Sequence, residues 1–340
     1  MSDTLIRLLA AFIATSSYTL MPYFVIATIH RFNVKKEYAN ANKQIIKVSI
    51  PPKFKQKYDD IQLDKIDNRH FKKAAVEFAK VLVEHFPEEA LTNLYNNLNE
   101  IKIRKNIVIS FFGLGGVYKV TNNSMSLSRT DCIYHELFHM ASASYDKESE
   151  TSYVGFRYIK SDISIGTGIN EGYTEVLTHR YFPKKSPEAY IFETDIARKL
   201  ETIIGADKMI LLYFRGDLFG LISELSNYMP EEEIMKFLKK VDFINSYYDD
   251  LGNTNIRESI FDIYEFLLKT YALKLKKQYE EGLINLDTFC QLSTDYLKSF
   301  KDTARFSLKN YKLRNIYKMY EIILKDISVP EEVSRCVPKP

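Results

Sequence analysis

His135-Glu136-Leu137-Phe138-His139 is the stretch that says most about this chain, because it places two histidines four residues apart. Residues at i and i+4 lie about 40° apart around a helix axis, so both imidazole rings point the same way. Two neutral imidazoles on one helix face can fill two corners of a tetrahedral zinc site. Glu136 lies between them and can take a proton from a zinc-bound water. The stretch therefore predicts a metal centre with two histidine ligands and a glutamate base.

The residues around this stretch indicate a helix buried inside a domain. Apolar side chains surround the three polar ones: Ile133, Tyr134, Leu137, Phe138 and Met140. Ser128 and Asp131 have the spacing of a capping box, which predicts that the helix begins about two turns before His135. Buried charges need partners, since an unpaired one costs several kcal/mol. A zinc ion would be that partner, and a hydrogen-bonded pair of core histidines is the alternative.

A third ligand is expected in the segment Gly166-Thr167-Gly168-Ile169-Asn170-Glu171-Gly172-Tyr173-Thr174-Glu175. Its two early glycines allow a sharp turn. After them Glu171, Glu175 and His179 recur every four residues, on one face of a helix. Glu171 would ligate the metal, and Glu175 would accept the spare ring N–H of a ligating histidine, which fixes its tautomer. The alternative for both glutamates is a solvated helix face.

Together the two segments resemble the gluzincin branch of the zincin metallopeptidases, in which HExxH is followed by a second glutamate motif. That motif reads N-E-x-x-S-D in thermolysin-like enzymes and contains N-E-G in membrane alanyl aminopeptidases; here it reads N-E-G-Y-T-E. The resemblance implies one zinc ion held by His135, His139 and Glu171. It also implies that Glu136 is the general base and that Glu175 orients a ligand.

This resemblance covers residues 106–182 and not the whole chain. The spacing from His139 to Glu171 is longer than in thermolysin-like enzymes, because residues 151–165 are inserted. The chain is therefore not a close relative of either enzyme group. It is also similar to uncharacterised bacterial zincin-like proteins with HELFHMA and NEGYTE segments, which imply no substrate.

The predicted fold class is α+β, mostly α. Residues 106–112 and 117–120 are rich in β-branched and aromatic side chains and indicate strands, and residues 124–128 run back after a turn. A small antiparallel or mixed sheet followed by the active-site helix resembles a zincin-like core. In that family the edge strand commonly pairs with an extended substrate peptide. Part of residues 106–128 would then line the substrate cleft.

Three parts are expected along the chain. Residues 1–34 form a hydrophobic N-terminal segment, and residues 35–185 form a zincin-like catalytic domain. Residues 186–340 form an all-helical C-terminal domain, because helical periodicity continues to the end of the chain. This half would pack against the core and close one side of the cleft.

The reaction that the resemblance implies is hydrolysis of a peptide bond in a peptide or protein substrate. Glu136 would take a proton from the zinc-bound water and return it to the leaving amine. The oxyanion needs a second donor besides zinc, and Tyr158 and His179 are the candidates. The chain contains 24 Tyr and 22 Phe, so any one tyrosine is as readily a packing residue.

The charge balance argues against a nucleic-acid partner. Lys and Arg number 47 against 44 Asp and Glu, for a net charge of +3. Hydrophobic residues make up 46% of the 340 residues, enough for a large core. A peptide or protein substrate is the partner that the resemblance implies.

Residues 8–29 contain no charged side chain and are long enough to cross a bilayer. Arg31, Lys35 and Lys36 follow, and the positive-inside rule then places the rest of the chain in the cytoplasm. We therefore expect membrane association through residues 8–29, with a cytoplasmic catalytic domain. A cleaved signal peptide and a buried helix in a cytoplasmic protein are the alternatives.

Two other classes of protein stay open. One is a non-catalytic zinc-binding scaffold or regulatory protein with a zincin-like fold, although a structural zinc site needs no base such as Glu136. The other is a helical interaction protein in which the HExxH sequence is fortuitous.

Overall fold

The computed structural model describes residues 47–48, 61–62, 68–105, 115–183, 185, 189–246, 254–300 and 313–330. The expected membrane segment at 8–29 and the expected strand at 106–112 lie outside these residues. Within the described part, no helix combines the length and the apolar character needed to cross a bilayer.

Contacts divide the chain into two units, Met1–Lys73 and Ala74–Pro340. In the first unit, β1 (Lys47–Val48) pairs with β2 (Ile61–Gln62) in an antiparallel ladder. Helix α2 (Arg69–His85) begins in the first unit and runs mainly in the second.

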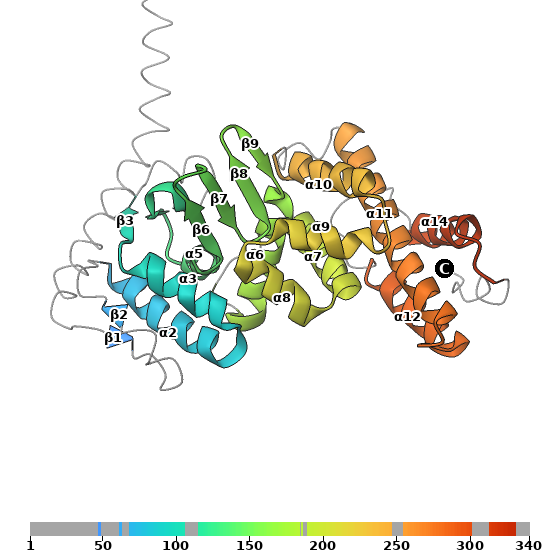
Figure 1. Cartoon of the computed structure of the whole chain (residues 1–340), viewed down its shortest axis with the longest axis horizontal. Coiled ribbons are helices and arrows are strands. Elements are labelled where there is room, and N and C mark those ends of the chain that lie inside the picture. Colours follow the sequence, from blue (N-terminus) through green and yellow to red (C-terminus); the bar gives the residue numbers. More distant parts are fainter. Residues whose placement is uncertain are drawn as a thin grey trace, which may run out of the picture. The chain divides into compact units, whose positions relative to one another are not determined.

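The second unit is mostly helical and also contains two small sheets, so the fold is mixed α+β, as expected (Figure 1). Two helices carry the motifs, α5 (Ile133–Ala141) and α6 (Thr167–Tyr181). The other helices are α3 (Glu88–Leu98), α7 (Ile191–Ile204), α8 (Ala206–Arg215), α9 (Leu218–Ser226), α10 (Glu231–Ser246), α11 (Thr254–Glu280), α12 (Leu286–Lys298) and α14 (Leu313–Asp326).

A three-stranded sheet precedes α5. Its central strand is β5 (Ser124–Leu127), with β3 (Lys102–Lys105) parallel on one side and β4 (Gly116–Lys119) antiparallel on the other. The 3-10 turn Val120–Asn122 joins β4 to β5, and Asn123 closes it in the left-handed region at φ 43°. The sheet is therefore mixed, and among the described strands β4 is the edge strand nearest the HExxH helix in sequence.

A four-stranded antiparallel meander fills the long spacing between the two motifs. It consists of β6 (Ala143–Asp146), β7 (Thr151–Val154), β8 (Arg157–Lys160) and β9 (Ile163–Ile165). The chain leaves α5 directly into β6 and enters α6 directly after β9. Hairpins between short strands return the chain to nearby points, so the insertion at 151–165 brings the start of α6 back toward α5.

Helix α5 starts later than its flanks predicted. It begins at Ile133, and the capping-box prediction at Ser128 is wrong. The Ser128 hydroxyl donates to the Gly115 carbonyl oxygen at 2.9 Å, and Asp131 forms an ion pair with Arg129. Both side chains are therefore engaged by other partners. Every residue of α5 is buried, as the apolar flanks indicated.

Two glycines allow other helices to approach α6 closely. A Cβ on Gly172 would lie 2.1 Å from the Glu193 carbonyl oxygen of α7, and a Cβ on Gly168 would lie 2.7 Å from the Val241 carbonyl oxygen of α10. The C-terminal helices thus pack directly on the helix that carries Glu171.

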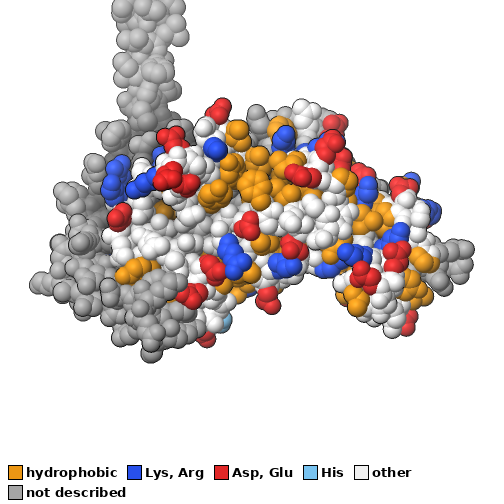
Figure 2. Space-filling model, in the orientation of Figure 1, with side chains coloured by type: hydrophobic (Ala, Val, Ile, Leu, Met, Phe, Trp, Pro, Cys, Tyr) orange, Lys and Arg blue, Asp and Glu red, His pale blue; other side chains and the backbone are white. Residues whose placement is uncertain are grey.

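Charged side chains of both signs are spread over the visible face, and hydrophobic side chains gather in its middle (Figure 2). Among the described residues, Ile163 and Phe219 are 56% and 57% exposed. The mixture of signs agrees with the small net charge of the chain.

Candidate metal centre

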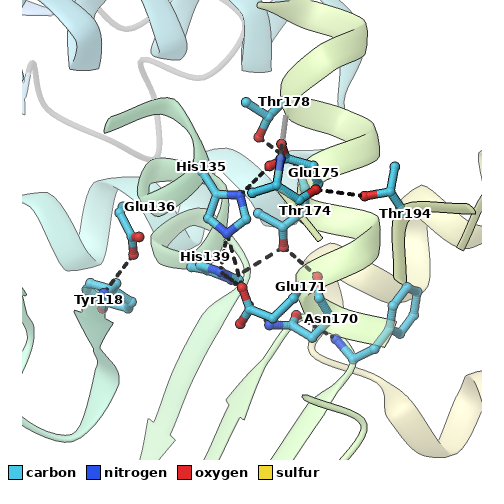
Figure 3. Close-up of polar contacts among 12 residues, drawn as sticks. Tyr118, His135, Glu136, His139, Asn170, Glu171, Thr174, Glu175, Thr178 and Thr194 are labelled. Carbon is cyan, nitrogen blue, oxygen red and sulfur yellow. Dashed lines mark hydrogen bonds and ion pairs between the residues drawn. The ribbon is translucent and has the colours of Figure 1, made fainter. Parts of the chain in front are cut away.

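His135, His139 and Glu171 come together from α5 and α6, although 32 positions separate His139 from Glu171 (Figure 3). The two Nε2 atoms are 3.0 Å apart. Glu171 Oε2 lies 3.1 Å from Nε2 of His135 and 3.2 Å from Nε2 of His139. The three side chains are 8%, 8% and 14% exposed, so the cluster is nearly buried.

This cluster has the dimensions of a metal site. Ligand atoms about 2.0–2.1 Å from a zinc ion in tetrahedral geometry are about 3.3 Å from one another, close to the separations found here. Two ring nitrogens at 3.0 Å repel each other unless a proton or a cation lies between them. The group can therefore hold a metal ion, and two imidazoles with one carboxylate are ligands that suit zinc.

Glu175 fixes the tautomer of His135. Its Oε2 lies 2.9 Å from Nδ1 of His135, and a carboxylate only accepts, so Nδ1 carries the proton. In the neutral ring, the form that binds a metal, the lone pair of His135 then lies on Nε2, the atom that faces Glu171. Glu175 is 2% exposed, and its other oxygen accepts from Nε2 of His179 at 2.7 Å and from the Ala189 N–H at 3.1 Å.

His139 is oriented by two residues that flank Glu171 on α6. Thr174 Oγ1 lies 3.4 Å from Nδ1 of His139, and Asn170 Nδ2 lies 3.3 Å from it. Asn170 Oδ1 accepts from the Phe156 N–H at 3.2 Å, and Thr174 Oγ1 lies 2.7 Å from the Tyr213 hydroxyl. Both contacts to His139 are long, so it is held less tightly than His135.

Glu136 lies beside the cluster against the edge strand β4. Its Oε2 accepts from the Tyr118 N–H at 2.7 Å, and it is 5% exposed. A Cβ on Gly116 would lie 2.7 Å from Cγ of Glu136, so only glycine leaves room for the side chain there. Figure 3 shows Glu136 turned toward Tyr118, apart from the three converging side chains.

Electrostatics in the cluster favour a positive charge between its members. Burial lowers the pKa of His135, but hydrogen bonds to Glu171 and Glu175 outweigh burial and raise it to about 10. Burial acts to raise the pKa of Glu171, yet His139 and His135 hold it well below its usual range. Burial raises the pKa of Glu136 against the opposing charges of His139 and His135. A carboxyl with a raised pKa suits a group that takes and returns a proton.

The residues expected at the site are distributed as follows. His135, His139 and Glu171 converge, and Glu175 contacts them through Nδ1 of His135. Glu136 lies beside them against Tyr118, and His179 is connected through Glu175 rather than by pointing at the cluster. Tyr158 lies in β8, where its ring contacts Tyr153 and Phe219 at centroid distances of 5.6 and 5.3 Å.

Sequence reasoning missed several residues of the site. Asn170 and Thr174 lie within the quoted segment at helical spacing on either side of Glu171, and that spacing was a usable signal. Tyr118 acts through its backbone, and Tyr190 comes from beyond α6. No pattern in the sequence links these two to the motifs.

Comparison with known proteins finds no matching family, no matching characterised protein and no matching solved structure.

Proposed function

We propose that this chain is a zinc metallopeptidase of the gluzincin type. The observation that carries the proposal is the convergence of His135, His139 and Glu171, with Glu136 on the same helix turn as His135. A bound zinc ion supplies an acidified water and polarises the carbonyl group of the substrate. A structural zinc site would not need a glutamate placed beside the metal as a base, which supports a catalytic centre.

Glu136 is the base in this proposal. It accepts a proton from the attacking water and returns it to the leaving amine nitrogen, so the side chain ends as it began. The Tyr118 N–H holds its carboxylate beside β4. Because β4 lies at the edge of the sheet formed by the described strands, an extended peptide can pair with it and bring a scissile bond to Glu136.

The test compares two variants of the full chain, with zinc content measured by elemental analysis and hydrolysis measured on casein. Glu136→Gln keeps about one zinc per chain and loses at least about 100-fold in hydrolysis, because the base is gone. Glu171→Ala loses zinc, because a ligand is gone. Glu148→Gln, an exposed change in a turn, retains both.

Hydrolysis that resists 1,10-phenanthroline, or stoichiometric zinc in Glu171→Ala, contradicts the assignment. Stoichiometric zinc without cleavage of any peptide in a broad library would instead indicate the scaffold that uses zinc for folding.

A further inference from the structure

The chain contains three cysteines, and the two that the structure describes are in different states. Cys132, just before α5, is a buried free thiol. Cys290, half-buried near the start of α12, is joined in a disulfide bond. A disulfide takes two cysteines, so the sequence leaves Cys336 as the partner of Cys290 within the chain. Cys336 itself lies outside the described residues.

Polar contacts tie α14, and the residues just after it, to the helices around Cys290. Ser293 lies one turn beyond Cys290 on α12, and its hydroxyl is 3.0 Å from the Tyr320 hydroxyl of α14. Both of these side chains are buried. Just beyond α14, the Ile327 carbonyl oxygen accepts from Nζ of Lys276 on α11 at 2.7 Å. The chain therefore leaves α14 beside the helices that surround Cys290.

The remaining chain is long enough to return to Cys290. Tyr320, which contacts α12, is seven positions before Ile327, a rise of about 10 Å along a helix. From Ile327 to Cys336 is 336 − 327 = 9 positions, and nine extended residues span about 30 Å. A bond between Cys290 and Cys336 is therefore within the reach of the backbone.

Cys132 is shielded from exchange with such a bond. Its thiol donates to the Arg129 carbonyl oxygen at 3.6 Å, and a Cβ on Gly115 would lie 2.2 Å from its Sγ, so the Gly115 backbone covers it. Burial and the charge of Asp131 raise the pKa of the thiol to about 12. A protonated thiol does not attack a disulfide. The third cysteine can therefore stay reduced while the other two are bonded.

We propose that Cys290 and Cys336 form a disulfide that fastens the C-terminal end of the chain to α12, and that Ala74–Pro340 works in an oxidising compartment. The bond closes a loop of 336 − 290 = 46 positions around α14. Closing a loop of this length removes conformational freedom from the unfolded chain, so the bond stabilises the folded C-terminal helices.

The chemistry of the bond determines the compartment. Two thiols become one S–S bond and give up two protons and two electrons. The acceptor is the disulfide of a thiol oxidoreductase, which is itself reduced to two thiols. Such oxidants act outside the cytosol, where thiols are otherwise kept reduced. An oxidised Cys290 therefore favours export of this unit over the cytoplasmic location expected from residues 8–29 and the charges that follow them.

The first test counts thiols in the full chain. Bacterial cells that express it are treated with N-ethylmaleimide before lysis, the chain is denatured in the same reagent, and labels are counted by intact mass. We expect one label per chain, on Cys132, and three after reduction with dithiothreitol. Cys290→Ser should carry two labels without reduction, because Cys336 is released.

The possible label counts decide both halves of the proposal. Three labels without reduction, both from cells and after incubation with oxidised glutathione, overturn the disulfide. Three labels from cells but one after oxidised glutathione overturn the oxidising compartment and retain the bond. A single label from cells supports both halves.

The second test measures the fastening role by melting the metal-free full chain in EDTA. Dithiothreitol should lower the melting temperature of the wild type by about 5–10 °C. Cys290→Ser, Cys336→Ser and the double variant should all melt at the reduced wild-type temperature and ignore dithiothreitol, because each removes the same bond. Gln291→Ala, an exposed change beside Cys290, should keep the shift. A wild type whose melting is unaffected by dithiothreitol overturns the fastening role. Neither test depends on zinc or hydrolysis, so both stand apart from the proposed function.

Discussion

Glu175 contributes more to this centre than its distance from the metal position suggests. It accepts hydrogen bonds from His135, His179 and Ala189, and it is almost fully buried. A carboxylate with several donors is stabilised in its charged form, and the pKa of Glu175 is accordingly lowered, although burial acts to raise it. At the residue scale, the Glu175 side chain thus fixes both the tautomer of His135 and the position of the backbone at Ala189.

Glu193 differs from Glu175 at the residue scale, because no hydrogen bond stabilises its buried carboxylate among the described residues. It is 0% exposed, and neither carboxylate oxygen has a hydrogen-bond partner among the described residues. Burial raises its pKa to about 7. Between about pH 4.5 and 7 the folded protein then holds a proton that the unfolded chain has released. The free energy of unfolding therefore falls as pH rises through this window.

Glu193→Gln should remove this pH dependence. At pH 8 we expect the variant to be more stable than the wild type by about 3 kcal/mol, since no charge has to be buried, and at pH 4.5 to be nearly equal to it. Urea unfolding of the metal-free chain at both pH values measures the difference. Glu148→Gln, at an exposed turn, should leave the slope unchanged. A wild-type stability that rises from pH 5 to pH 7 relative to Glu193→Gln would contradict the assignment.

At the element scale, α10 caps the helix that carries Glu171. Asp242 accepts from the Gly166 N–H at 2.9 Å and from the Gly168 N–H at 2.8 Å. Backbone N–H groups at the start of a helix have no partner within the helix, and the side chain of the N-cap residue usually accepts from one of them. Gly166 stands at the N-cap with φ 82° and has no side chain for this purpose. A residue far along the chain therefore replaces a local cap.

Asp242→Ala should loosen α6 at its start. We expect a loss of about 1–2 kcal/mol in the free energy of unfolding, the usual cost of removing a helix cap, together with weaker zinc binding because Glu171 lies in the next turn. Chemical denaturation and a zinc titration with a competing chelator measure the two effects. Asp326→Ala, at the exposed end of α14, should change stability by less than about 0.5 kcal/mol. Unchanged zinc affinity in Asp242→Ala would show that the cap is not needed to place Glu171.

The element scale also shows where sequence patterns were sufficient. The helix around His135 was predicted from its apolar flanks, and α6 from the four-residue spacing of Glu171, Glu175 and His179. The start of α5 was missed because Ser128 and Asp131 bond to other partners. A capping box is a local pattern, and tertiary contacts can take its side chains away.

For the molecule as a whole, the centre joins two helices, α5 and α6, that the four-stranded meander separates in sequence. A ligand that binds only the folded state stabilises it by mass action, by about 2.7 kcal/mol when its free concentration is 100 times its dissociation constant. Because α7 and α10 pack on α6, this stabilisation should extend to the C-terminal helices within Ala74–Pro340.

Zinc should therefore raise the melting temperature of the chain, by roughly 5 °C at that concentration. Differential scanning calorimetry with and without EDTA measures the shift. In Glu171→Ala the shift should vanish, whereas in Glu136→Gln it should persist. An equal shift in Glu171→Ala would mean that zinc binds elsewhere in the chain.

The amino-acid order alone determined the local part of this protein: an α+β composition, a buried helix with two histidines on one face, and a second helix with a glutamate face. Helical periodicity specifies these because side chains three or four residues apart share a face whatever surrounds them. Only the tertiary structure decided that β4 holds Glu136, that Asp242 caps α6, and that Tyr190 lies over His135. Those contacts join segments distant in the chain, and their geometry depends on how whole elements pack, which no local pattern encodes.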